Sequence, residues 1–253
     1  MSISEKALQL KEDFDEVYEA GKQKEWSDFW DIFQQKGNRK RYEYAFSQGY
    51  YNQGVLGWTD KTFKPKYDMK PTNAERMFEF TDNITDLKGI LEKQGVTLDL
   101  SNCTSSAFMF RACAKLTRLP VLDFSQHTGT ASISSCFKYC YALESIDKII
   151  FNNEGTNITE VSTTFDSCGK LKEIRFEGVI GRSISFAWSP LSLESMKSII
   201  THLKDYSGTT NAGKYTLTLK DSCKTLMAEQ GTMEELGGKT YDQYITDIGW
   251  NLA

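Results

Sequence analysis

The chain has 253 residues, of which 40% are hydrophobic and 13% aromatic, so it can bury a sizeable core and is not a disordered chain. Its 30 basic and 34 acidic residues leave a net charge of −4, and the longest basic run is the short GNRKR at 37–41, so nucleic acid is not an expected partner. Nothing approaches the roughly 18 apolar residues of a membrane span. The N-terminal MSISEKALQLKEDFDE lacks the apolar segment of a signal peptide, so export by that route is not expected.

The first 24 residues carry a heptad pattern whose apolar positions step by four and three residues: Ile3, Ala7, Leu10, Phe14, Val17 and Gly21. Two interpretations stay open, an amphipathic helix packed on its own domain and a coiled-coil seam that drives self-association. The heavily charged remaining faces favour the seam. A homo-oligomer follows from it, and the bulk of Phe14 favours a trimer over a dimer. The expected assembly residues are Ile3, Leu10, Phe14 and Val17.

A second short helix is expected over 25–36, with Trp26, Phe29, Trp30 and Phe33 on one side, ending at Gly37 and Asn38. A segment rich in Tyr and Gly follows, and its prolines mark a linker. The aromatic residues of this segment suit a small core, although exposed ones would suit a sugar or protein contact. We therefore expect residues 1–66 to form an N-terminal helical assembly or docking segment.

One motif recurs four times in the middle of the chain. FMFRACAKLTRLP, CFKYCYALESI and TFDSCGKLKEI share a frame in which Phe, Cys and two aliphatic residues follow at steps of three, and MFEFTDNITDL keeps the frame with Thr in place of Cys. The anchors Phe78, Phe110, Phe137 and Phe165 lie 27 to 32 residues apart. Because no single repeat can bury its own apolar face, this period predicts repeats that stack on their neighbours.

The cysteines of this frame, Cys113, Cys140 and Cys168, occupy one repeated core position, where a thiol behaves as a small hydrophobe. We expect them to be reduced and buried. His127 and His202 belong to no ligand pattern, and Cys136 with Cys140 lacks a partner pair, so no metal or cofactor is expected.

Over roughly residues 74–180 the repeated core resembles the BspA-like leucine-rich repeats. The resemblance implies an α/β leucine-rich-repeat solenoid over 67–180, with about four repeats, short parallel strands and irregular turns. This sequence departs from the family in its longer repeats, in a first repeat without cysteine, and in Pro120, which interrupts an expected strand. A looser similarity, carried by YDMKPTNAERMF, LEKQGVTLDL, GVIGRSISFAWSPLS and GWNLA, is to proteins encoded in phages and prophages of gut bacteria.

Beyond residue 180 the repeats decay. Ser189 and Pro190 predict the start of a helix that runs to about Leu203, YTLTLKD alternates as a strand, and 223–230 suits a short helix. We therefore expect residues 181–253 to form an α/β C-terminal cap over the last repeat.

Catalysis is not expected, because the chain lacks the nucleophile-elbow, phosphate-loop and zinc-helix motifs and any Cys and His pairing with an orienting third residue. The expected sheet instead offers columns of solvent-facing positions that begin at Thr85, Asp86 and Lys88. These columns mix both charges with small polar residues. Two interpretations stay open: the columns recognise a glycan or a protein, or they form a surface that contacts only solvent. The candidate binding residues are Thr117, Arg118, Glu144, Asp147, Lys172, Glu173 and Arg175.

The similarity to phage proteins implies a non-enzymatic virion protein, associated with the tail and made in the bacterial cytoplasm without a signal peptide. Its N-terminal helices would assemble or dock the subunit, and its repeat face would meet other virion proteins or a host-surface glycan or protein. The alternative, implied by the BspA-like resemblance, is a bacterial surface adhesin or interaction protein located at the cell surface. An uncharacterised hydrolase is a remote third hypothesis.

Overall fold

The computed structural model describes residues 46, 58–128, 132–158 and 160–253. Within this part the chain forms two three-stranded parallel sheets, in the orders β1-β2-β3 and β4-β5-β6. The strands are β1 Arg118–Asp123, β2 Ser145–Ile150, β3 Glu173–Glu177, β4 Ile184–Phe186, β5 Tyr215–Leu219 and β6 Trp250–Leu252. The helices are α3 Leu87–Gln94, α4 Leu193–Thr201, α5 Asp221–Glu229 and α6 Tyr241–Asp247, with a 3-10 helix η1 Glu234–Leu236.

The expected leucine-rich-repeat solenoid is wrong. The structure is a mixed α/β fold with two small sheets, not a continuous series of about four strand and turn units. The first copy of the motif leads into α3 where a strand was expected. Asp86 caps this helix by accepting a hydrogen bond from the Gly89 amide, and Gly95, at φ 66°, ends it. At the other end the chain enters α4, so the first sheet stops at three strands.

The phenylalanines of the motif form a continuous stack of rings inside the core. Phe78, Phe110, Phe137 and Phe165 follow one another with ring centroids 5.3, 5.9 and 5.2 Å apart and planes within 19° of parallel. Phe186 extends the stack, with its ring 4.7 Å from that of Phe165. These anchors are almost fully buried, which makes the stack the centre of a single hydrophobic core.

The cysteines of the motif are free and buried, as the sequence predicts. Each thiol donates to the carbonyl oxygen of the anchor in the preceding turn, over 3.0 to 3.2 Å between Sγ and O: Cys113 to Phe78, Cys140 to Phe110 and Cys168 to Phe137. Thr81 occupies the same position in the first copy and donates to the carbonyl of Phe46 over 2.9 Å. The position therefore requires a small donor beside the backbone.

The strands of the first sheet pair in register, with Arg118 opposite Ser145 and Ser145 opposite Glu173. Pro120 does not interrupt a strand. It lies inside β1, the outer strand of the sheet, beyond the single bridge that Arg118 makes with Asp86, and proline is tolerated at such an edge.

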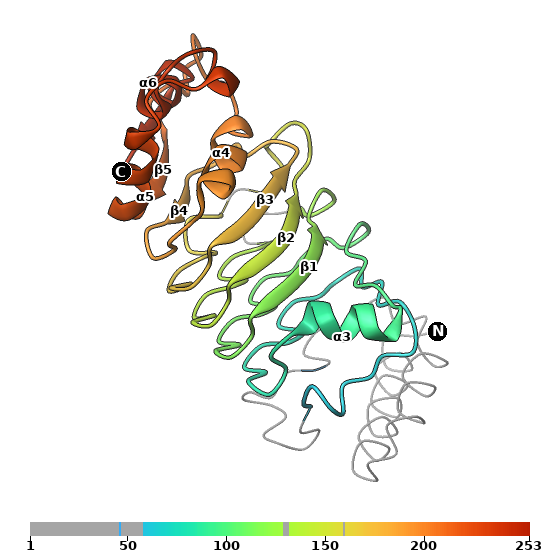
Figure 1. The fold of residues 1–253 in the computed structure, drawn as a ribbon. Helices are drawn as coiled ribbons and strands as arrows, with labels where there is room; N and C mark the ends of the chain where they lie inside the picture. Colours follow the sequence, from blue (N-terminus) through green and yellow to red (C-terminus); the bar gives the residue numbers. More distant parts are fainter. Residues whose placement is uncertain (1–45, 47–57, 129–131, 159) are drawn as a thin grey trace, which may run out of the picture.

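Helices close both edges of this sheet (Figure 1): α3 lies beside β1 and α4 beside β3. On α4, the hydroxyls of Ser195 and Ser198 accept hydrogen bonds from the amides of Ile174 and Phe176 in β3, each over 2.9 Å. The helix begins at Leu193 with Ser192 as its N-cap, three residues later than the sequence suggests, because Ser189 is buried and donates to the Cys168 carbonyl. The second sheet, with α5 and α6, lies at the C-terminal end of the molecule (Figure 1).

The predicted assembly residues Ile3, Leu10, Phe14 and Val17, and the helix expected over 25–36, lie outside the described residues. In the described ranges no helix combines the length and the apolar character needed to cross a membrane.

Candidate binding surface

Backbone hydrogen bonds bring most of the candidate residues into two rows across the first sheet. The carbonyl of Thr117 accepts from the amide of Glu144 over 2.8 Å, and the carbonyl of Glu144 accepts from the amide of Lys172 over 3.0 Å. The second row runs from Arg118 through Ser145 to Glu173. Because each row is fixed by the pairing of the backbone, the spacing of its side chains is set before any ligand arrives.

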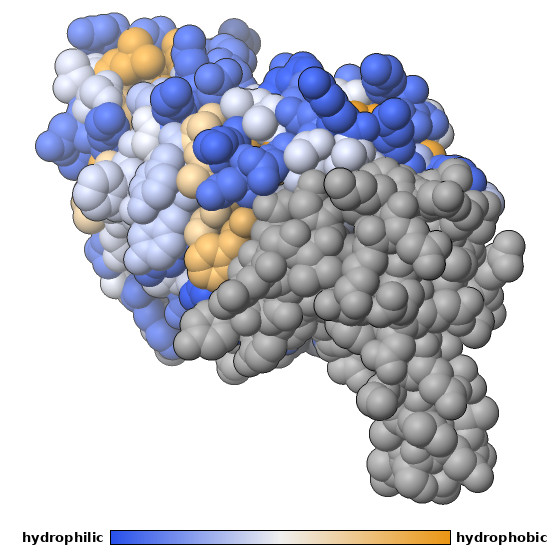
Figure 2. All heavy atoms as spheres, turned by 90° about the horizontal axis from the view of Figure 1, so that it is seen from below, coloured by the Kyte–Doolittle hydropathy of each residue, from blue (hydrophilic) through white to orange (hydrophobic). Residues whose placement is uncertain are grey.

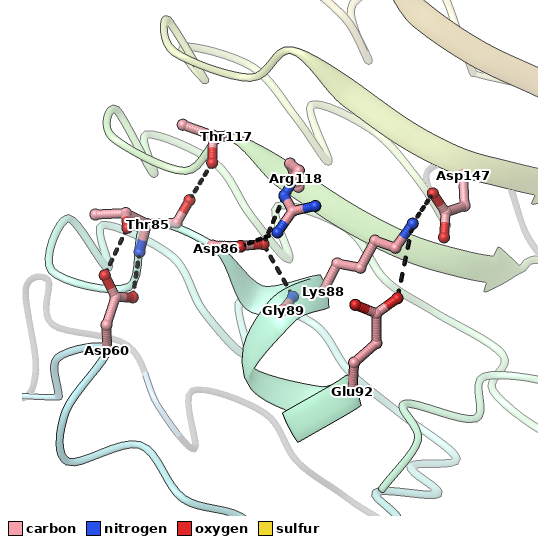
Figure 3. A network of polar contacts seen from close by, with 9 residues as sticks. All are labelled: Asp60, Thr85, Asp86, Lys88, Gly89, Glu92, Thr117, Arg118 and Asp147. Atoms are coloured by element: carbon pink, nitrogen blue, oxygen red, sulfur yellow. Dashed lines mark hydrogen bonds and ion pairs between the residues drawn. The ribbon is translucent and has the colours of Figure 1, made fainter. Parts of the chain in front are cut away.

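The rows begin at α3, and there the polar side chains are held by one another (Figure 3). Arg118 binds Asp86 through two nitrogens: Nε donates to Oδ1 over 3.1 Å, and Nη2 makes a second short contact with Oδ2. Since Asp86 also caps α3, this pair ties the start of the helix to β1. The hydrogen bond to Asp86 raises the pKa of Arg118, so the guanidinium stays charged.

A second ion pair joins the first turn of α3 to β2. Lys88 Nζ donates to Asp147 Oδ1 over 2.7 Å and lies 3.8 Å from Glu92 Oε1 (Figure 3). The hydrogen bond to Asp147 raises the pKa of Lys88. A ligand that approached Asp147 would have to displace this lysine.

The hydroxyl of Thr117 is likewise engaged in a hydrogen bond within the chain. Its hydroxyl donates to the Thr85 carbonyl over 2.7 Å, and Asp60 accepts hydrogen bonds from the amide and the hydroxyl of Thr85 (Figure 3). The candidates Thr117, Arg118 and Asp147 therefore hold the N-terminal side of the sheet in place.

Between α3 and the strands lies a groove of about 500 Å³. Its apolar lining is Leu91, Val96, Leu98, Leu100, Pro120, Val121 and Ile150, and its charged lining is Lys88, Glu92, Asp99, Asp123 and Asp147. The charge of the lining is therefore predominantly negative over an apolar floor.

A second hollow, of about 690 Å³, opens over the starts of β2 and β3. It brings together the candidates Glu144, Lys172 and Glu173 with Lys170, which the strand pattern missed because it lies in the turn before β3. Glu173 accepts a hydrogen bond from the Ser192 hydroxyl over 2.9 Å. The remaining candidate, Arg175, is exposed in the middle of β3.

The groups best suited to chemistry lie in the core. His127 is fully buried, its Nε2 lies 2.9 Å from the Ser106 hydroxyl, and burial lowers the pKa of the imidazole to about 3. Burial likewise raises the pKa of the Cys168 thiol to about 12. These groups are therefore neutral at pH 7. In the described part of the chain no group of three or more His, Cys, Asp or Glu could hold a metal ion.

Comparison of the chain with family models, with curated proteins and with solved structures gives no match. The resemblance to BspA-like repeats and the similarity to phage proteins therefore stay predictions.

Proposed function

We propose that this chain is a non-enzymatic structural and binding protein of a phage or prophage virion, associated with the tail. In this role the rows across β1, β2 and β3 recognise a host surface or a neighbouring virion protein. The N-terminal helices assemble or dock the subunit, as their heptad pattern predicts.

The observation that carries the proposal is the fixed register of the polar rows. Glu144, Lys172 and Arg175 are exposed, and in the described ranges no ion pair is made by any of the three. The backbone of Glu144 is held by the segments on both sides of it, and that of β3 by β2 on one side and α4 on the other. A rigid backbone loses little entropy on binding, which lowers the cost of recognition by many polar contacts.

The surface is consistent with such contacts. On the face shown in Figure 2, the hydrophobic surface of the described residues is divided into small patches among hydrophilic side chains. Recognition on that face would depend on polar and local aromatic contacts, as in many interfaces that are not obligate.

The first experiment is mass spectrometry of phage particles purified from bacteria that carry the gene. We expect to detect peptides of this chain in the particles, together with peptides of the tail proteins. Recovery only from the cell envelope of bacteria without particles would overturn the proposal and favour the surface adhesin.

The second experiment measures binding of the full-length chain to host cells. Replacing Lys172 and Arg175 by Glu reverses one charge of the rows and one exposed charge beside them on β3, and should weaken binding about tenfold or more. Replacing Lys61 and Lys64 by Glu changes the net charge equally, away from the sheet, and should leave binding unchanged. Equal effects of the two double variants would show that only net charge matters, contrary to the proposed role of the rows.

A further inference from the structure

The turns that carry the phenylalanine anchors expose an unusual share of aromatic surface. In the described part of the chain six large hydrophobic side chains are exposed, and four of them lie in these turns: Phe80, Tyr139, Tyr141 and Trp188. Three of the four follow an anchor by two residues, and the same position in the intervening turns holds Ala112 and Ser167. We call the row Phe80, Ala112, Tyr139, Ser167 and Trp188 the turn ridge. Along it a bulky ring alternates with a small side chain.

Hydrogen bonds keep the ridge in line. The amide of Phe80 donates to the carbonyl of Arg111, that of Ala112 to Lys138 and that of Tyr139 to Asp166, over 2.8 to 3.0 Å. Each acceptor is the residue just before the next ridge position. Trp188 belongs to the turn of Phe186, whose ring is the last in the core stack. The ridge therefore follows the stack turn by turn.

The spacing of the exposed rings follows from the stack. Phe78 and Phe137 are two steps apart, with steps of 5.3 and 5.9 Å, and Phe137 and Phe186 are separated by steps of 5.2 and 4.7 Å. The turns that carry an exposed ring are thus separated by about 10 to 11 Å along the core stack.

These rings are maintained against two costs. Phe80 and Tyr139 have φ of 60° and 67°, in the left-handed region that suits glycine or asparagine and strains a bulky residue. Each is 39% exposed, so a substantial part of each ring faces solvent at a strained position. The left-handed conformation belongs to the turns themselves, since Ala112 and Ser167 share it, whereas the exposed ring at every second turn indicates a contact made outside the chain.

The charges beside the ridge neutralise one another. Arg111 Nη2 lies 2.6 Å from Glu79 Oε1, and Lys138 Nζ lies 3.3 Å from Asp166 Oδ2. Lys138 also sits 5.2 Å from the centre of the Tyr139 ring and helps to fix its position. Such a surface favours an uncharged ligand that offers flat apolar faces together with hydroxyl groups.

We propose that the turn ridge binds an extended, uncharged polysaccharide of β-1,4-linked pyranoses. A sugar unit in such a chain advances by about 5 Å, close to the spacing of neighbouring strands. Every second ring then stacks on Phe80, Tyr139 or Trp188, and the ring between passes over Ala112 or Ser167. The proposal rests on the proposed recognition of a host surface and adds the ligand class and a site separate from the rows of the first sheet.

The test is calorimetric titration of the full-length chain with three soluble hexasaccharides. The β-1,4-linked hexamers of N-acetylglucosamine and of glucose are extended, whereas the α-1,4-linked glucose hexamer is coiled and serves as the control of shape. At least one β-linked probe should bind, and the α-linked probe should bind about tenfold more weakly or not at all. No binding of either β-linked probe, or equal binding of the α-linked probe, would overturn the proposal.

Two matched variants assign the site. Tyr139→Gly removes a ring and its backbone strain, so affinity should fall about tenfold while the melting temperature stays level or rises. Ser135→Gly relieves a left-handed residue in the same turn, at φ 51°, without removing a ring or changing the ridge, and should leave affinity unchanged. If Tyr139→Gly bound the sugar as tightly as the parent, the turn ridge would not be the binding site. Sugar binding by a chain that is missing from purified particles would instead contradict only the virion role.

Discussion

The thiol of Cys140 donates to the backbone carbonyl of Phe110, with 3.0 Å between Sγ and O. The contact joins one turn of the core to the turn before it, and Cys113 and Cys168 make the same contact one turn to either side. The thiols thus serve as polar links in an otherwise apolar core.

We therefore expect the cysteines to be unreactive in the folded chain. Burial raises the pKa of all six thiols, which lowers the fraction of reactive thiolate, and it also blocks access. At pH 8 a chromogenic disulfide reagent should react at least about a hundredfold more slowly with native than with denatured protein. A thiol that reacted at the same rate in both states would contradict the burial of its turn.

Phe137 lies in the middle of the ring stack, so its truncation should be costly. Phe137→Ala should lower the free energy of unfolding by about 3–5 kcal/mol, because it leaves a cavity between Phe110 and Phe165. Tyr141→Ala removes an exposed ring from the same turn, 54% exposed, and should cost less than about 0.5 kcal/mol. Urea denaturation gives the free energy of unfolding of both variants. If the two variants lost similar stability, the ring stack would not be the centre of the core.

Gly181 packs its Cα directly against another backbone segment. A Cβ at this position would lie 1.8 Å from the carbonyl oxygen of Gly155, a group that cannot move aside cheaply. Gly181→Ala should therefore destabilise the fold by about 2–4 kcal/mol. Gly169 has no atom within 4 Å of its Cβ position, so Gly169→Ala should be close to neutral. Thermal unfolding measures the stability of both variants. If Gly181→Ala were as stable as the parent, Gly181 and the Gly155 carbonyl would not be in close contact.

His127 should make stability depend on pH. Burial lowers its pKa from the ordinary value of 6.5, which the unfolded chain retains, to about 3 in the fold, so between these values only the unfolded chain binds the extra proton. The stabilisation is fully present above pH 6.5 and is lost as the pH falls, by about 1.4 kcal/mol per pH unit. Between pH 6.5 and pH 4 we expect a loss of about 3 kcal/mol in urea denaturation. His127→Gln can retain the hydrogen bond to Ser106 without titrating, and an equal slope in that variant would assign the effect to other groups.

Asp86 combines a cap with an ion pair, and two substitutions separate these roles. Asp86→Ala removes both and should cost about 1–2 kcal/mol, most of it from the lost cap. Asp86→Asn keeps an acceptor for the Gly89 amide and loses only the charge opposite Arg118, which is 46% exposed, so it should cost less than about 1 kcal/mol. Chemical denaturation measures the free energy of unfolding of both variants. A larger loss for Asp86→Asn than for Asp86→Ala would contradict the conclusion that the cap contributes more than the ion pair.

The periodic core was readable from the sequence because one frame places the same residue types in the same contacts. Phe110, Phe137 and Phe165, with their cysteines, stack as their spacing predicts. The sequence frame does not predict Phe186, because this residue follows Phe165 by a shorter interval and Ser189 replaces the cysteine. The predicted solenoid is wrong because the frame does not continue as a strand through Leu87: Asp86 and Gly95 are ordinary signals for the two ends of a helix.

The candidate surface was only partly readable for a similar reason. Strand register follows from the sequence pattern, so the rows through Glu144 and Lys172 could be foreseen. The partners of Arg118 and Asp147 come from α3 and its cap, and a segment expected to be a strand could not supply them. The exposed rings of Phe80 and Tyr139 depend on left-handed turn geometry, which the spacing of apolar residues does not reveal.

The serines of α4 have a consequence for assembly. The outer edge of a sheet is normally a template on which a strand from another molecule can add, and Ser195 and Ser198 occupy the amides that such a strand would use. Two hydroxyl groups thus end the sheet without a further strand, at little cost in apolar surface. Copies of this chain can crowd together, as they would in a large particle, without joining edge to edge into fibres through this sheet.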